Sequence, residues 1–199
     1  MYQDVSLEEY IKAGMEARSK INPGQIRRIA SRIVDSFEKG GKLVTFGNGG
    51  SAADAQHFVA ELTGHFSFER RPLAAICLNT NVSSVTAIAN DYSYDEIFSR
   101  QVDALVKSGD IVIGITTSGN SPNVINGINA ARRLGAYTIA MTGKSGGKIK
   151  SLCSDVVNVE SDDTPIIQEM HIAIIHMICL EIDRMIVKEK LFLLTGTVP

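Results

Sequence analysis

The sequence has few cysteines, few aromatic residues, no long basic run and no apolar run that could cross a bilayer. Cys77, Cys153 and Cys179 are too few and too widely spaced for a disulfide framework or a cysteine-based zinc site, so we expect a reducing, cytoplasmic location. A net charge of −2 excludes a global attraction to nucleic acid or anionic lipid. The run Ile172–Leu180 is interrupted by His176 and is too short to span a membrane. No basic region followed by an apolar stretch opens the chain, so no signal peptide is expected.

The 199 residues suffice for one domain with a full core, and no repeat or linker divides them. Two amphipathic helices are predicted over 6–20 and 23–39, the second with Asn22 as its cap and Pro23 in its first turn. Short apolar runs then alternate with helical patterns, which indicates an α/β fold with a parallel sheet covered on both faces. The expected strands cover 43–46, 73–78, 111–116, 137–141 and 156–159, and the expected helices cover 51–64, 82–106, 121–134, 146–152 and 164–189.

Three of the predicted strands end in small polar residues, at the edge of the sheet where ligands bind in such folds. The segment Thr116–Pro122 carries four hydroxyl groups and runs into a helix, so free N–H groups and the helix dipole favour an anion there, although a plain capped turn is the alternative. The segment Gly47–Ser51 could do similar work, but its match to a dinucleotide fingerprint is weak because no acid follows the second strand. Gly143-Lys144-Ser145 is no nucleotide-binding loop, because Thr138 stands where the first glycine is required.

Two pairs of polar residues suggest a second kind of site. His57 and Glu61 differ by about 40° on a helix, and Gln168 and His176 by roughly 80°, so each pair can point into one pocket. Two imidazoles, a carboxylate and an amide oxygen suit a divalent metal or proton transfer near neutral pH. The alternatives are a solvated helix pair and a core histidine.

The two remaining histidines have simpler interpretations. His171 lies about 140° around the same helix from His176, so we expect it to be structural or to support the site from behind. His65 follows Gly64 at a helix end and is predicted to lie on the surface.

Taken together, these motifs resemble those of the bacterial phosphoheptose isomerases, members of the sugar-isomerase (SIS) superfamily. The resemblance runs from about residue 20 to residue 185, and the joint occurrence of the motifs is far more specific than the phosphate loop alone. The motifs are Gly47-Asn48-Gly49-Gly50-Ser51, Asp54-Ala55-x-His57, Glu61-Leu62-Thr63-Gly64, Asn90-Asp91, Ile97-Phe98-Ser99-Arg100, Thr117-Ser118-Gly119-Asn120-Ser121, Thr142-Gly143-Lys144, and Gln168-Glu169-x-His171 with His176.

The resemblance implies a flavodoxin-like, three-layer SIS fold and isomerisation of sedoheptulose 7-phosphate to D-glycero-D-manno-heptose 7-phosphate, the first step toward nucleotide-activated heptoses. It implies one zinc ion per subunit, with the family's ligands falling on His57, Glu61, Gln168 and His176. We assign Glu61 as the acid–base at carbon and His176 as the proton shuttle between the oxygens. The substrate-contacting positions of the family fall on Asn48, Gly49, Gly50, Ser51, Asn90, Asp91, Thr116, Thr117, Ser118, Ser121 and Gln168.

Two positions depart from the family pattern. Thr116 stands where many relatives have serine, which keeps the hydroxyl group. Pro165 stands where some relatives have an aspartate, and Asp162 or Asp163 is a possible substitute. Other SIS proteins bind the replication initiator or sense a sugar phosphate as regulatory modules. Retention of both polar pairs favours the enzyme over these alternatives.

A homo-oligomer is expected, a tetramer by the resemblance, with active sites shared between subunits and with Glu61 and His176 from different chains. The sequence gives an independent reason, because the helices at 23–39 and 164–189 are more apolar than one small sheet can cover. We expect a single SIS domain over 1–199 in which residues 1–40 form a helical extension that contacts other subunits.

Overall fold

Five parallel strands form one sheet in the order β2-β1-β3-β4-β5 in the computed structural model, which describes residues 5–193. The ends of the predicted domain, 1–4 and 194–199, lie outside the described residues. The order 2-1-3-4-5 is that of flavodoxin-like folds, so the predicted fold class is confirmed. The strands are β1 (Leu43–Gly47), β2 (Ala75–Cys77), β3 (Ile111–Thr116), β4 (Tyr137–Gly143) and β5 (Asp155–Val159).

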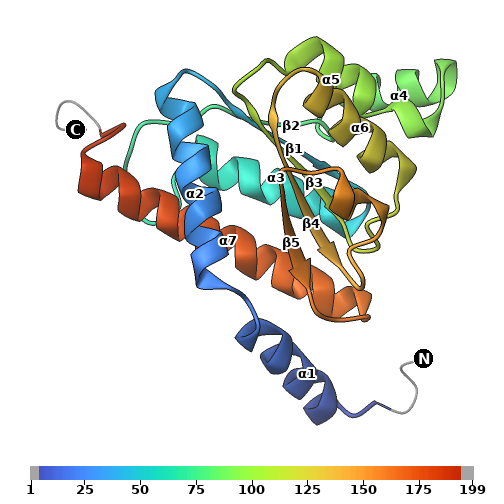
Figure 1. Cartoon of the computed structure of the whole chain (residues 1–199), viewed down its shortest axis with the longest axis vertical. Helices are drawn as coiled ribbons and strands as arrows, with labels where there is room; N and C mark the ends of the chain where they lie inside the picture. Colours follow the sequence, from blue (N-terminus) through green and yellow to red (C-terminus); the bar gives the residue numbers. More distant parts are fainter. Residues whose placement is uncertain (1–4, 194–199) are drawn as a thin grey trace.

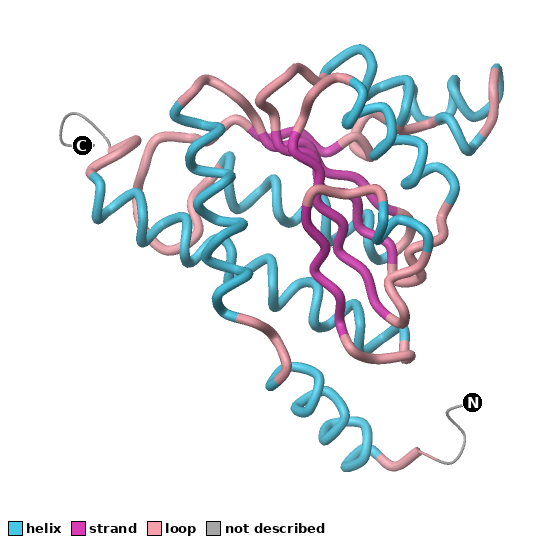
Figure 2. Tube along the Cα trace, in the orientation of Figure 1, coloured by secondary structure: helices cyan, strands magenta, loops and turns pink. Residues whose placement is uncertain are grey.

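Helices cover both faces of this sheet (Figures 1 and 2). One face packs against α2 (Pro23–Glu38), α3 (Gly50–Thr63) and the long α7 (Thr164–Glu189). The opposite face packs against α5 (Ser99–Leu105) and α6 (Pro122–Arg133). The remaining elements are α1 (Leu7–Ser19), α4 (Val82–Asp91) and the 3-10 helices η1 (Tyr94–Glu96) and η2 (Lys148–Ser151).

Burial on both faces explains why the strands are continuous apolar runs. All six residues of β3 are buried, with Ile113 and Ile115 in the core under α2, α3 and α7, and Val112 in the core under α5 and α6. Helix α6 approaches the sheet closely because a glycine stands on each side of the contact, Gly114 on β3 and Gly127 on α6. A Cβ on Gly114 would lie 2.9 Å from Val124 Cγ1, and one on Gly127 would lie 2.7 Å from Phe46 Cζ.

Three predicted elements differ from the observed ones. The helix predicted over 82–106 is wrong, because the chain forms α4, η1 and α5 in its place. The predicted strand 73–78 keeps only three residues, since the N–H of Leu73 donates to Leu62 at the end of α3 and not to a neighbouring strand. The helix predicted over 146–152 is a single 3-10 turn, which is η2.

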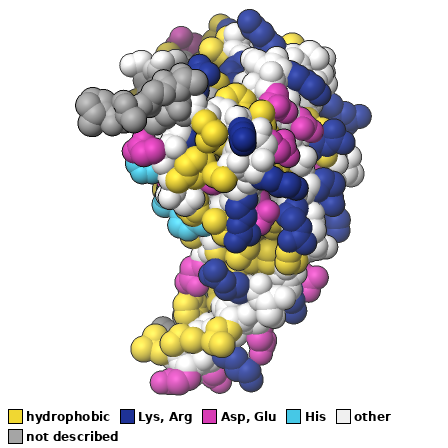
Figure 3. Space-filling view, turned by 90° about the vertical axis from the view of Figure 1, so that its left-hand side faces the viewer, with side chains coloured by type: hydrophobic (Ala, Val, Ile, Leu, Met, Phe, Trp, Pro, Cys, Tyr) yellow, Lys and Arg dark blue, Asp and Glu magenta, His cyan; other side chains and the backbone are white. Residues whose placement is uncertain are grey.

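Helix α1 projects from the body of the molecule, and its contact with the rest of the chain is narrow (Figures 1 and 2). Tyr10 donates a hydrogen bond to Glu169 of α7, and Ala17 is buried. The apolar side chains Leu7, Ile11 and Met15 are 60–77% exposed, and Figure 3 shows hydrophobic side chains along this protruding end. The predicted helix is therefore confirmed, but three of its apolar side chains, Leu7, Ile11 and Met15, are left uncovered by the described chain.

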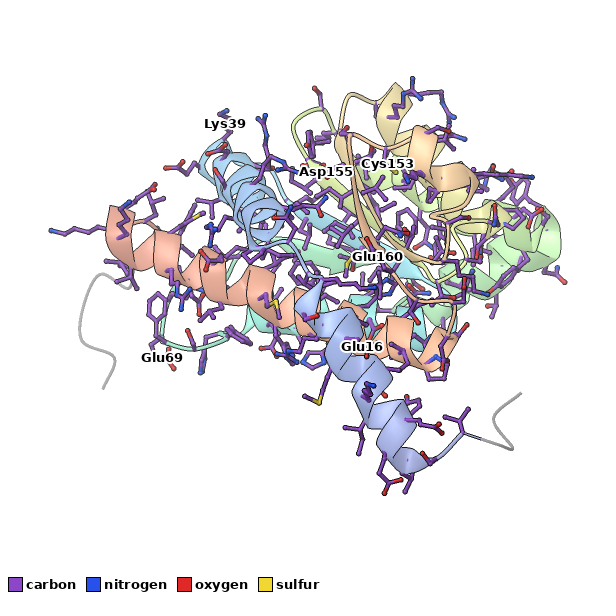
Figure 4. All side chains as sticks on the ribbon, turned by 60° about the horizontal axis from the view of Figure 1, so that its bottom comes forward. Glu16, Lys39, Glu69, Cys153, Asp155 and Glu160 are labelled. Atoms are coloured by element: carbon purple, nitrogen blue, oxygen red, sulfur yellow. The ribbon has the colours of Figure 1, made fainter. Side chains whose placement is uncertain are left out.

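Buried and half-buried ion pairs fix the helices that carry the site. Arg70 Nε lies 2.9 Å from Asp183 Oδ1 of α7, with both side chains almost fully buried. Arg70 also donates to Glu61 O and Leu62 O, which ties the end of α3 to α7. On the other flank Asp155, labelled in Figure 4, accepts from Arg28 of α2. Within residues 5–193, none of the helices is long and apolar enough to cross a membrane.

Candidate active site

The carboxyl ends of β1, β3 and β4 bring the three predicted polar loops to one edge of the sheet. The loop after β4 is bonded directly to the loop after β3. Gly143 N donates to Thr117 O at 3.1 Å, and Ile149 N donates to Gly119 O at 3.0 Å. Strand β1 leads through Asn48 and Gly49 into α3. The expectation that these segments share one edge is therefore confirmed.

The loop after β3 has the geometry of an anion cradle. Thr116 Oγ1 and Ser121 Oγ lie 3.0 Å apart, and Thr117, Ser118 and Ser121 are all partly exposed. Ser121 precedes α6 as predicted, but its hydroxyl group contacts Thr116 and caps no backbone N–H. In the first turn of this twelve-residue helix Pro122 has no N–H and the Val124 N–H faces Asn123 Oδ1, so the Asn123 N–H and the positive end of the dipole remain available to a negative charge.

Two glycines hold this loop in shape. Gly119 has φ +66° and Gly147 has φ +58°, and their backbones touch. A Cβ on Gly147 would lie 2.4 Å from Ser118 O, and a Cβ on Gly119 would lie 2.0 Å from Gly146 O. No side chain fits between the loops, so the loop after β4 acts as a rigid back wall for the hydroxyl-rich loop.

Helices α3 and α7 bring together three of the four predicted metal ligands. His57 Nε2 lies 2.8 Å from Glu61 Oε1 and 3.4 Å from His176 Nε2. One potential ligand atom from each of these three residues lies within 4.8 Å of the other two. His57 and Glu61 share one helix face as predicted, with side chains 44% and 21% exposed. We call His57, Glu61 and His176 the triad.

The triad suits a divalent cation. Ligand atoms at 2.0–2.2 Å around a tetrahedral zinc ion are separated from one another by roughly 3.3–3.5 Å. The Nε2 atoms of His57 and His176 are 3.4 Å apart, which lies in this range. Glu61 Oε1 lies 2.8 Å from His57 Nε2 and needs to move away from it only slightly. Two imidazoles and a carboxylate are also a donor set found at zinc sites. The residues therefore fit the metal that the resemblance implies.

Gln168, the fourth predicted ligand, lies at the start of α7 and packs over the glycine loop. A Cβ on Gly50 would lie 2.6 Å from Gln168 Nε2. The lack of a side chain at Gly50 therefore lets Gln168 reach the loop at the sheet edge. The triad lies about two helical turns further along α3 and α7.

One expectation about the triad needs correction. The resemblance placed Glu61 and His176 on different subunits, whereas one chain brings both to the same point. The reason is the packing of α3 against α7, which the buried Arg70–Asp183 pair fastens at the end of α3. The triad is therefore complete within a single chain.

Asn90 and Asp91 are not brought to the triad or to the hydroxyl-rich loop. The Asn90 side chain bonds to its neighbour, with Nδ2 donating to Asp91 Oδ1 at 2.8 Å, and both side chains are exposed. They end α4, a helix without a fully buried residue. Asp91 instead lines a groove of about 640 Å³ with Tyr92 and Arg100, whose guanidinium group lies 3.7 Å from the Tyr92 ring centre.

The two remaining histidines lie as predicted, and the two aspartates proposed as substitutes lie just before α7. His171 is fully buried, its Nε2 lies 3.0 Å from Thr142 O, and desolvation lowers its pKa to about 4. His65 is half exposed and lies 3.6 Å from Glu69. Asp163 occupies the position before α7, and Asp162 is exposed.

Three polar residues for which the sequence predicts no role organise the loop after β1. Asn79 accepts from Gly47 N and donates to Gly47 O, so its side chain extends the ladder beyond β2. Asn123 exchanges two hydrogen bonds of 2.9 Å with Asn48, and Tyr94 Oη lies 3.1 Å from Asn48 Oδ1. Only the position of Asn79 directly after a predicted strand hinted at such a role.

Asp54, one turn before His57, has an unusual environment. Its Oδ2 atom is buried and has no hydrogen-bond partner among the described residues. Desolvation raises the pKa of this carboxyl group to about 6, and the nearby His57 partly opposes the rise.

Comparison with known proteins defines the family. Residues 8–143 match the model of the SIS domain. A relative from Thermoplasma acidophilum, named "Probable phosphoheptose isomerase", is 62% identical over 88% of this chain and 97% of its own length. The chain belongs to the phosphoheptose isomerase family.

Solved structures of this family agree with the fold described above. The phosphoheptose isomerase from Francisella tularensis is 38% identical, with a TM-score of 0.86 over 89% of this chain and 96% of that one. The phosphoheptose isomerase from Neisseria gonorrhoeae is 42% identical, with a TM-score of 0.82 over 90% and 100%. In both comparisons the similarity covers nearly the whole length of both chains. It therefore favours an isomerase over a binding or sensing module.

Proposed function

We propose that the protein converts sedoheptulose 7-phosphate to D-glycero-D-manno-heptose 7-phosphate, a step toward nucleotide-activated heptoses. The observation that carries the proposal is the intact triad in a chain of the phosphoheptose isomerase family. An initiator-binding or sugar-sensing protein has no need for these donors together with an open phosphate loop. The substrate phosphate binds at the hydroxyl-rich loop, where Ser118, Ser121 and the start of α6 supply donors.

The exchange proceeds through an enediol. The Glu61 carboxylate takes a proton from C1 of the ketose, and the electron pair of that C–H bond forms the C1–C2 double bond while the carbonyl oxygen at C2 takes a proton from His176. His176 then recovers a proton from the O1 hydroxyl group as the C1 carbonyl forms, and Glu61 returns its proton to C2 to give the aldose. Glu61 Oε1 faces His57, which leaves Oε2 for this transfer.

The metal proposed for the site is zinc, one ion per subunit. His57, Glu61 and His176 would hold it. The family pattern adds Gln168 as the fourth ligand, although its side chain lies over the glycine loop in this chain. When bound, the ion supplies Lewis-acid polarisation of the substrate oxygens. The remaining substrate contacts proposed for the chain are those of the loops and of α4, namely Asn48, Gly49, Gly50, Ser51, Asn90, Asp91, Thr116, Thr117, Ser118, Ser121 and Gln168.

The experiment that tests the function supplies sedoheptulose 7-phosphate to chelated protein, with and without added zinc, and identifies the product by NMR. We expect the heptose 7-phosphate to form only after zinc is restored. Full turnover by rigorously metal-free protein would contradict the metal role. No product under either condition would contradict the proposed reaction.

The active form is proposed to be a homo-oligomer, a tetramer by family resemblance, with residues 1–40 in its contacts. The proposal is supported by the exposed Leu7, Ile11 and Met15 on a projecting helix. It is also supported by the position of Asn90 and Asp91, which a second subunit could bring to a neighbour's site. Sedimentation of the active protein as a monomer would overturn this part.

Subunit exchange tests where the shared residues lie. Because one chain completes the triad, mixed Glu61→Gln and His176→Ala variants should not regain activity. Mixed Glu61→Gln and Asp91→Ala variants should regain part of it, since each hybrid then combines an intact triad with an intact Asp91 from a partner. Cytoplasmic location is proposed as well, supported by the three free cysteines.

A further inference from the structure

The amide group of Asn48 is held in one orientation by its neighbours. A backbone N–H can only donate, so the Val124 N–H, 2.9 Å from the side chain of Asn123, must face the Asn123 oxygen. The amide nitrogen of Asn123 therefore faces Asn48 and needs an acceptor, which is Asn48 Oδ1 at 2.9 Å. The return bond runs from Asn48 Nδ2 to Asn123 Oδ1 at 2.9 Å. One unambiguous donor thus fixes both amides.

The hydroxyl group of Tyr94 completes this arrangement. It lies 3.1 Å from Asn48 Oδ1, an acceptor, so it must donate. Asn48 Oδ1 then accepts two hydrogen bonds and is saturated, whereas Asn48 Nδ2 uses one of its two protons on Asn123. Asn48 is half-buried, so its second proton remains available at the sheet edge.

We infer that Tyr94 is a positioning residue, which acts through Asn48 to present a single N–H donor to an oxygen of the sugar phosphate. The inference rests on the proposed function. By occupying the second lone pair of Asn48 Oδ1, Tyr94 leaves that oxygen unable to accept a hydrogen bond from the substrate. Donation into the amide oxygen also polarises the amide and strengthens its remaining N–H.

A purely structural role does not account for this hydroxyl group. Tyr94 is 56% exposed and belongs to the short helix η1, so its hydrogen bond contributes little to the core. Tyr92 offers a matched control, since it is 59% exposed two residues away and its ring carries the Arg100 contact. No hydrogen bond joins the Tyr92 hydroxyl group to any described residue.

The test compares Tyr94→Phe with Tyr92→Phe in steady-state kinetics on sedoheptulose 7-phosphate. Loss of one hydrogen bond acting equally on bound substrate and transition state should raise KM roughly two- to tenfold and leave kcat within about twofold. Tyr92→Phe should change neither value, and both variants should keep the wild-type melting temperature. An unchanged KM in Tyr94→Phe would overturn the inference.

A double-mutant cycle with Asn48→Ala separates positioning from direct contact. If Tyr94 acts through Asn48, Tyr94→Phe should have no further effect on KM in the Asn48→Ala background. The same factor in both backgrounds would show that Tyr94 acts on its own, which would overturn the positioning role.

A readout without substrate distinguishes failure of this inference from failure of the proposed function. The side-chain amide resonances of Asn48 should shift in Tyr94→Phe and stay in place in Tyr92→Phe. Wild-type protein that leaves sedoheptulose 7-phosphate unchanged would overturn the proposed function. Unshifted Asn48 resonances would overturn the role of Tyr94 whatever the substrate is.

Discussion

The buried His171 should make the stability of the protein depend on pH in a predictable way. The side chain is fully buried between α7 and β4, where it contacts Thr142 O, and desolvation lowers its pKa from 6.5 to about 4. Above pH 6.5 the imidazole is neutral in both folded and unfolded chains. Between pH 6.5 and 4 the unfolded chain binds a proton that the folded chain does not, so stability is lost as pH falls through this window.

The size of the loss follows from the difference between the two pKa values. With 1.36 kcal/mol for each pKa unit, a fall from 6.5 to about 4 corresponds to about 3 kcal/mol per chain. Replacing His171 with Gln removes the titrating imidazole, and the amide nitrogen of Gln can still donate a hydrogen bond to Thr142 O. The variant should therefore lose less stability than the wild type between pH 6.5 and 4.

The assay is urea unfolding of chelated protein at fixed concentration and at several pH values. Other titrating groups are common to both proteins, so the difference between the two curves isolates His171. His65→Gln, at a half-exposed histidine, serves as the control and should follow the wild type. Parallel stability curves for His171→Gln and wild type would refute the reasoning.

Three further predictions concern the loops and the helix pair. Ser118→Ala and Ser121→Ala should each weaken binding of sugar phosphate by about 1–3 kcal/mol in calorimetry, because each removes a donor to a charged group, and unchanged affinity in both would show that the phosphate binds elsewhere. Gly147→Ala should weaken binding of inorganic phosphate, because its Cβ would lie 2.4 Å from Ser118 O. The control Gly40→Ala is also at positive φ but has nothing within 4 Å of its Cβ, so it should leave phosphate affinity unchanged. Equal phosphate affinities in the two variants would contradict the role of the loop after β4 as a back wall. Arg70→Met should cost about 3–5 kcal/mol in chemical unfolding, because it leaves the Asp183 charge buried and unpaired, and a loss under 1 kcal/mol would contradict that assignment.

Most of the fold could be predicted because its signals are local. Strand β3 and helix α7 have the predicted bounds. Strand β3 is an apolar run buried on both faces, and α7 follows Asp163 at its cap position and has Pro165 in its first turn. The prediction of one helix over 82–106 failed because no glycine or proline marks the breaks between α4, η1 and α5. They follow from contacts distant in sequence, such as the donation of Gln101 Nε2 to Leu78 O.

The candidate site divides in the same way. The pairing of His57 with Glu61 could be read from their spacing, because four residues make one helix face. The contact between His57 and His176 spans 119 positions and depends on how α3 packs against α7. The exchange of hydrogen bonds between Asn48 and Asn123 spans 75 positions and leaves no pattern in the sequence.

The most direct test of the account is solvent deuterium exchange by Glu61→Gln, compared with the wild type. In deuterated water, zinc-loaded wild-type protein should convert sedoheptulose 7-phosphate to an aldose that carries deuterium at C2, followed by NMR. Glu61→Gln should bind the sugar phosphate but lose about 100- to 10,000-fold in both turnover and deuterium incorporation, because it lacks the base. Near wild-type exchange by Glu61→Gln would contradict the assignment of Glu61 as the acid–base at carbon.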